Sequence, residues 1–174
     1  MFGKDRINLL LISSFFLILF LVGCDPSSND KMELYNSTKS IDLSDENIKS
    51  IFINSTQDKI TDVFGKPNFI EWIKQPKSSY YIFGENDKNY DVDFRLFNGK
   101  VTRYFISSDK YATNKGISKG DSKDEVIKAY GKNYYERIDT GSNIIGYLDK
   151  VKKISIEFGL NNNKVNGIIV SETK

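Results

Sequence analysis

The alternation of apolar and polar residues predicts short helices packed on antiparallel strands. Residues 79–83, 90–97 and 100–107 are rich in aromatic and β-branched side chains, which is typical of strands. Asn98-Gly99 separates the last two segments, and both residues tolerate the positive φ of a tight hairpin turn. The pattern therefore predicts a three-stranded antiparallel meander.

Two helices are predicted ahead of this meander. The first would have Ser44 as its N-cap, because acidic residues follow it in the first turn. The second would begin near Ser55 or Thr56 and end at Gly65. Its apolar positions would share one face, which could cover the sheet: Ile60, Val63 and Phe64.

The same order of elements recurs in the second half of the sequence. The segment ending at Gly131 aligns with the helix ending at Gly65 after a shift of 66 residues. Ser122-Lys123-Asp124-Glu125 is typical of a capping box at the start of this helix. Farther along, residues 156–158 align with residues 92–94 after a shift of 64, so a loop shorter by two residues reconciles the two shifts.

We therefore expect an α+β fold, in which a unit of short helices packed on an antiparallel β-meander is repeated in tandem. One unit alone would have a thin core, and two packed together would bury more surface. The expected organisation has four parts: a signal peptide at 1–23, a flexible tether at 24–42, a first repeat at 43–108 and a second repeat at 109–174.

The beginning of the chain has the pattern of an export signal and is therefore not expected to belong to the fold. Lys4 and Arg6 precede an apolar run over residues 7–22. The run ends in Leu21-Val22-Gly23-Cys24, which resembles the lipobox of bacterial lipoproteins. The resemblance implies cleavage between Gly23 and Cys24 and attachment of a diacylglycerol to the Cys24 thiol. A buried free thiol and an uncleaved membrane anchor are the other interpretations of this region.

Composition excludes several classes of function. Removing residues 1–23 would take away two basic side chains and one acidic side chain from a total of 25 Lys and Arg and 23 Asp and Glu, which leaves a nearly neutral chain. A nucleic-acid-binding protein usually has a clustered basic face, so we expect no nucleic-acid partner. The chain has no histidine, and Cys24 is its only cysteine. It therefore lacks the usual general base, metal ligand and nucleophile pairs, and we predict no catalytic residue, no metal and no cofactor.

Two patterns of acidic residues could nevertheless carry chemistry. Asp91 and Asp93 alternate with apolar residues, so they would lie together on the solvent face of a strand, where paired carboxylates can perform acid–base catalysis. Asp87 to Asp91 has the alternating oxygens of a calcium loop, but Val92 and Asn98 stand where that loop needs glycine and an acid. An envelope hydrolase is therefore the alternative function.

Aromatic residues suggest a binding surface. Tyr and Trp beside arginine are the residues that dominate binding hot spots. Four residues are the candidates for such a surface on the sheet: Trp72, Tyr81, Arg95 and Arg103. Ordinary packing in the core or at an edge is the other interpretation of each.

A family resemblance can be placed on residues 60–72, with the sequence ITDVFGKPNFIEW, followed by Tyr80-Tyr81. These residues resemble the YjgB-like family of uncharacterised Gram-positive lipoproteins. More distantly, Gly120 to Val126 with Gly131 is similar to modules of BamE-type assembly lipoproteins and of the beta-lactamase inhibitor protein. The resemblance implies an architecture and a location, and both distant relatives act by binding other proteins.

The preferred hypothesis is a non-catalytic binding or adaptor module. The lipid on Cys24 would hold it on the outer face of the cell membrane of a Gram-positive bacterium. Its partner would be an envelope protein or a cell-wall glycan. A purely structural lipoprotein is a third possibility.

Overall fold

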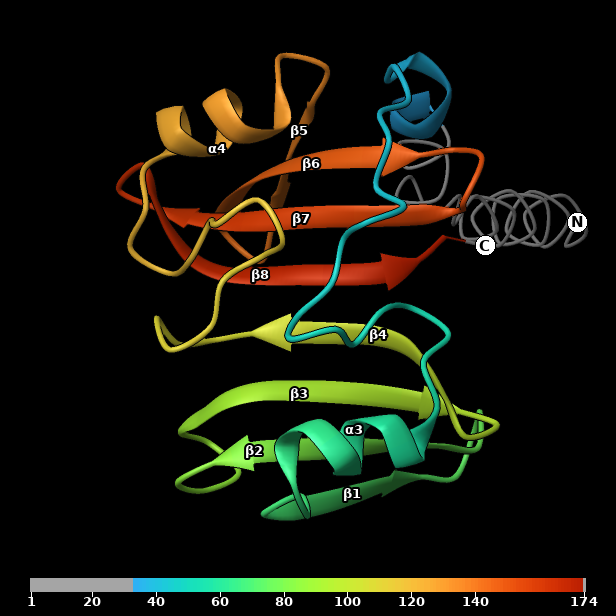
Figure 1. Cartoon of the computed structure of the whole chain (residues 1–174). Coiled ribbons are helices and arrows are strands. Elements are labelled where there is room, and N and C mark those ends of the chain that lie inside the picture. Colours follow the sequence, from blue (N-terminus) through green and yellow to red (C-terminus); the bar gives the residue numbers. More distant parts are fainter. Residues whose placement is uncertain (1–32, 174) are drawn as a thin grey trace, which may run out of the picture. The chain divides into compact units, whose positions relative to one another are not determined.

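Eight antiparallel strands form one continuous sheet in the computed structural model (Figure 1). The model describes residues 33–173, and the elements discussed here belong to the compact unit Tyr35–Lys174. The strand order is β1-β2-β3-β4-β8-β7-β6-β5, so β1 and β5 are the outer strands. The strands are β1 (Phe69–Ile73), β2 (Ser78–Gly84), β3 (Tyr90–Phe97), β4 (Lys100–Ile106), β5 (Tyr135–Asp139), β6 (Ser142–Asp149), β7 (Ile154–Asn161) and β8 (Lys164–Glu172).

The expected fold class was wrong. The structure is mainly one antiparallel sheet with few, short helices, not a tandem repeat of α+β units with a meander each. Antiparallel pairing of β4 with β8, from Arg103↔Ser171 to Ile106↔Ile168, joins the two sets of strands into this single sheet. Each set also has four strands and not the three that the sequence predicted. The additional strands are the outer strands β1 and β5. An outer strand with little burial lacks the alternation that marks a half-buried strand.

The two helices of eight residues lie where the sequence predicts them. α3 (Gln57–Phe64) has Thr56 as its N-cap, and α4 (Lys123–Tyr130) has Ser122. The glycines after the two helices, Gly65 and Gly131, have φ values of 80° and 92°, a region that favours glycine. The predicted capping box is confirmed, since the Glu125 carboxylate accepts from the Ser122 N–H at 2.7 Å.

Ser122→Ala is expected to lower the free energy of unfolding by about 1 kcal/mol, because it removes the acceptor for an N–H group in the first turn of α4. Chemical denaturation monitored by circular dichroism would measure the loss. Ser122→Thr is the control, since threonine keeps a hydroxyl acceptor. Equal stability of the alanine variant and the wild type would contradict a role for this cap.

The helix predicted to start at Ser44 is absent, and the chain forms turns there. Lys49 and Ser50 have φ values of 49° and 65°, which an α-helix does not allow. Ile48 and Ile51 instead exchange two backbone hydrogen bonds across this turn. The apolar residues that suggested a helix face are buried all the same: Leu43, Ile48, Ile51 and Ile53.

The core lies between the helices and one face of the sheet. A row of residues in register crosses that face from β2 to β6: Tyr81, Phe94, Tyr104, Val170, Ile156 and Tyr147. Phe64 at the end of α3 contacts Phe94, with ring centroids 5.1 Å apart, and Tyr130 at the end of α4 contacts Phe158 at 5.2 Å. Both helices therefore cover the same face. We call the opposite face, which neither of these two helices covers, the open face, although Ile82, Asp93 and Leu148 on it are buried.

The segment before α3 crosses both sets of strands (Figure 1). Ile41 N–H donates to the Leu148 carbonyl at 2.8 Å, and Leu43 N–H donates to the Asp149 carboxylate at 3.0 Å. Farther along, Asn54 N–H donates to the Val101 carbonyl at 2.8 Å. The last residues assigned to the tether are thus bonded to the folded unit.

Candidate binding surface

The structure distributes the four predicted surface residues over different environments. Trp72 on β1 is 69% exposed, whereas Tyr81 on β2 is only 6% exposed and belongs to the core. Arg95 and Arg103 form one cross-strand pair on β3 and β4, on the open face of the sheet. The prediction of a joint surface including Tyr81 was wrong, because its side chain points to the helix-covered face.

The outer strand β1 is the most exposed apolar segment of the described sheet. Phe69 is 38% exposed and Ile70 is 45% exposed, in addition to Trp72. Trp72 borders a shallow pocket of about 230 Å³ between the start of α3 and the β3–β4 turn. The pocket is lined by Gln57, Trp72, Lys77, Ser78, Ser79, Leu96, Asn98 and Gly99. Sequence reasoning selected Trp72 correctly as exposed but did not recognise the strand that carries it.

The other outer strand, β5, carries charged side chains that form ion pairs. Arg137 bonds to Glu157 of β7 through its Nε and Nη2 atoms at 2.8 Å, and it reaches Asp139 at 2.7 Å. Burial alone would raise the pKa of Glu157, but hydrogen bonds from Arg137 and Tyr135 outweigh it and lower this pKa. Gly146 leaves room for the ring of Tyr135, whose hydroxyl donates to Glu157 at 2.6 Å.

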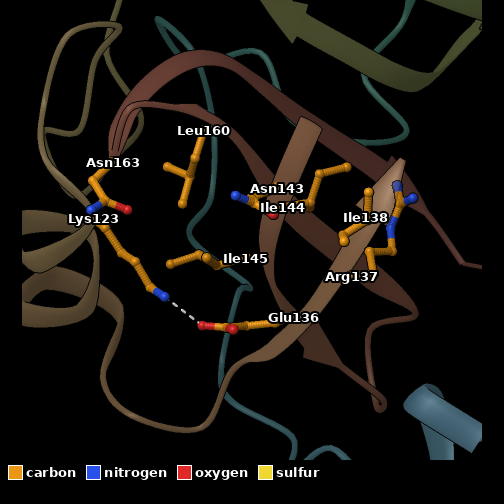
Figure 2. A pocket seen from close by; sticks show the side chains of 9 residues that line it. All are labelled: Lys123, Glu136, Arg137, Ile138, Asn143, Ile144, Ile145, Leu160 and Asn163. Carbon is orange, nitrogen blue, oxygen red and sulfur yellow. Dashed lines mark hydrogen bonds and ion pairs between the residues drawn. The ribbon is translucent and has the colours of Figure 1, made fainter. Parts of the chain in front are cut away.

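A larger pocket of about 380 Å³ lies beside β5, on the side of α4 (Figure 2). Figure 2 shows Lys123 and Glu136 facing each other across it, and these two side chains form an ion pair. The remaining lining residues are Arg137, Ile138, Asn143, Ile144, Ile145, Leu160 and Asn163. Because its charged groups pair with one another or with neighbours, this pocket offers no unpaired charge to a ligand.

The carboxylates considered for acid–base chemistry are engaged by separate cations. Asp93 Oδ1 lies 2.8 Å from Arg103 Nη1, and Asp91 Oδ2 lies 2.8 Å from Lys110 Nζ. The expectation of an exposed pair was wrong for Asp93, because its side chain is buried although no helix covers this side of β3 among the described residues. Burial raises the pKa of Asp93, against the lowering by Arg103. Burial and the neighbouring Asp93 charge raise the pKa of Tyr90 to about 12.

The two predicted arginines stack on aromatic rings of the open face. The Arg95 guanidinium lies 5.9 Å from the Tyr80 ring centroid, and that of Arg103 lies 5.5 Å from the ring of Phe105. Arg95 Nε is buried without a hydrogen-bond partner among the described residues. These arginines are therefore only partly available for contacts with another molecule.

A buried carboxyl group that sequence reasoning missed lies under α4. Glu46 is buried, its Oε2 accepts from the Tyr130 hydroxyl at 2.6 Å, and its Oε1 accepts from Asn114 N–H at 3.1 Å. Burial raises the pKa of Glu46, although both hydrogen bonds act in the opposite direction. Its fixed partners indicate a role in holding the segment before α3 against α4.

The lipid-attachment and cleavage predictions at Gly23 and Cys24 lie outside the described residues. Within residues 33–173, no helix combines the length and the apolar character needed to span a membrane.

Comparison with known proteins shows similarity only at the level of structure. No family model and no curated protein matches the chain, so the YjgB-like resemblance stays a prediction. Among solved structures, the chain is similar to an extracellular protein containing an SCP domain from Bacillus anthracis, with a TM-score of 0.51 and 11% identity over 78% of this chain and 46% of that one. At that identity the likeness shows the fold and nothing of the activity.

Two further solved structures have TM-scores below 0.5. A cysteine-rich secretory protein from Staphylococcus aureus gives 0.47 at 15% identity, over 70% of this chain and 44% of that one. A putative beta-lactamase inhibitor protein from Streptococcus mutans gives 0.32 at 12% identity, over 83% and 96%. The chain spans less than half the length of the first two proteins.

Proposed function

We propose that this protein is an extracytoplasmic, lipid-anchored binding module without catalytic activity, whose protein partner docks on the outer strand β1. The exposed apolar character of β1 carries the proposal. Phe69, Ile70 and Trp72 all lie on this one strand. Exposed apolar residues grouped on an outer strand are typical of an interaction site, because an outer strand left bare invites pairing with another chain.

The location follows from the beginning of the sequence. The lipobox-like residues before Cys24 would place the lipid at the start of the mature chain, on the outer face of the cell membrane of a Gram-positive bacterium. Extracellular and secretory proteins among the structural neighbours are in line with this location. An envelope protein is the partner that best suits an apolar strand, and a cell-wall glycan suits it less, because sugars need more polar groups.

Site-specific cross-linking in living cells tests this proposal. A photoreactive benzoylphenylalanine would replace Trp72, which lies on β1, or Ile138, which is 74% exposed on the opposite outer strand β5. We expect light-dependent adducts with a protein from position 72 and none from the matched position 138. Equal adducts from both positions, or none from either, would contradict docking on β1.

A further inference from the structure

We propose that β1 binds its partner by strand addition: an extended segment of another protein pairs with the free edge of β1 and places a basic side chain opposite Glu71. This inference rests on the proposed function and specifies the chemistry of the partner. Recognition by strand addition takes affinity from main-chain hydrogen bonds and specificity from the side chains beside them.

The edge of β1 is open to such pairing. Among the described strands, β1 pairs only with β2, from Phe69↔Ile82 to Ile73↔Ser78. In an antiparallel outer strand, every second residue directs its N–H and C=O groups away from the sheet. Those groups of β1 can therefore be satisfied by another strand.

The opposite edge shows how the same sheet discourages pairing. Arg137 and Asp139 on β5 form an ion pair with each other, and Glu136 pairs with Lys123. Charged side chains on an outer strand are a usual protection against edge-to-edge association. β1 has only one charged residue among its five, Glu71, so this protection is much weaker there.

Glu71 determines which kind of strand fits. It is exposed at the centre of β1 and forms no ion pair within residues 33–173. If a second copy of β1 paired antiparallel over its full length, Phe69 would face Ile73 and Glu71 would face its own copy. Like charges directly opposite each other destabilise a strand pair, whereas opposite charges stabilise it. The occupant is therefore a different chain with a basic residue at this position.

The flanks of β1 define the rest of the segment. Lys66 and Lys74 are exposed on either side of the strand, which favours acidic residues at both ends of the partner segment. Ile70 and Trp72 share the helix-side face, because Ile70 is paired with the core residue Tyr81. Apolar side chains of the partner would lie beside them, next to the pocket at Trp72. The expected pattern is acidic, apolar, basic, apolar, acidic.

The single tryptophan of the chain makes the test direct, because Trp72 lies on the proposed interface. The probe is a capped peptide with the sequence Asp-Thr-Val-Lys-Val-Thr-Asp, titrated into the protein while the fluorescence is recorded. We expect a saturable blue shift of the emission as water leaves the indole. A peptide with glutamate in place of the central lysine should bind about fivefold more weakly or worse.

A charge exchange provides the sharpest outcome. In Glu71→Lys the preference should reverse, so that the peptide with the central glutamate binds more tightly than the one with lysine. Glu71→Gln should lose the discrimination between the two peptides. Because Glu71 is exposed, both variants are expected to fold, and circular dichroism would check this. Binding by neither peptide, or the same preference in all variants, would overturn strand addition with a basic residue.

Two other results are distinguishable from these. Adducts at position 72 in cells together with no peptide binding would keep the proposed function and overturn strand addition. Self-association of the wild type that is abolished by Ile70→Lys but not by Ile138→Lys would make a second copy the occupant, and would also overturn the proposal. Sedimentation velocity at the concentrations of the titration would detect it.

Discussion

Phe158→Ala is expected to lower the free energy of unfolding by about 3–5 kcal/mol, the usual cost of deleting a large buried aromatic side chain. Phe158 on β7 is fully buried and contacts Tyr130 of α4 and Tyr147 of β6, with ring centroids 5.2 Å and 6.3 Å apart. Its removal would leave a cavity beneath the helix. Urea unfolding monitored by far-ultraviolet circular dichroism would measure the effect.

Phe97→Ala is the matched control, because Phe97 is also a phenylalanine of the sheet but lies exposed at the end of β3. Its replacement is expected to cost about 1 kcal/mol or less, as for most surface substitutions. Similar costs for the two variants would contradict the packing of α4 on this face. If Phe158→Ala lowers the free energy of unfolding but leaves its slope against urea concentration unchanged, the variant exposes the same amount of surface on unfolding as the wild type.

The elements that the sequence predicted correctly are those with local causes. Thr56 and Ser122 satisfy N–H groups within one turn of themselves, and Gly65 adopts a positive φ just after α3. The turn at Asn98-Gly99 also depends only on the residues within it, which have φ values of 51° and 73°. Such features need no tertiary contact, and the sequence is therefore enough.

The elements that it missed depend on distant contacts. β1 has one neighbouring strand and little burial, so its residues carry no period of two. The apolar residues near Ile48 do become buried, but by packing of turns beneath the sheet and not by a helix. Joining the two sets of strands requires β4 to pair with β8, which lies more than sixty positions later in the chain. No pattern within one window could reveal that pairing.

The candidate site shows the same division. The exposure of Trp72 was correctly inferred from composition. The burial of Tyr81 depends on which face of β2 the helices cover, and the sequence does not show this. Glu46 could not be identified either, since its partner Tyr130 is 84 residues away. A buried acid among solvated ones has no local signature, because its surroundings come from another part of the fold.

Tyr130→Phe is expected to lower the free energy of unfolding by about 1–3 kcal/mol at pH 7, because it leaves the buried Glu46 carboxylate without one of its hydrogen-bond donors. The ring would remain in place against Tyr147 and Phe158. Tyr134→Phe is the control, since Tyr134 also contacts Tyr147 and is only partly buried. Equal losses in the two variants would contradict a specific role of the Tyr130–Glu46 bond.

The stability of the wild type should also depend on pH, in a direction that the raised pKa of Glu46 determines. Below the ordinary pKa of a glutamate, Glu46 is neutral in both folded and unfolded chains and the buried site carries no charge penalty. Above that value the unfolded chain releases the proton more readily than the folded chain does. The free energy of unfolding therefore decreases as pH rises through the raised pKa of the folded state. Glu46→Gln should therefore have a flatter stability profile than the wild type as pH rises above about 4.5. Because Asp93 and Glu157 titrate in both proteins, the difference between the two profiles isolates Glu46, and parallel profiles would show that its carboxyl group ionises as freely as one in water.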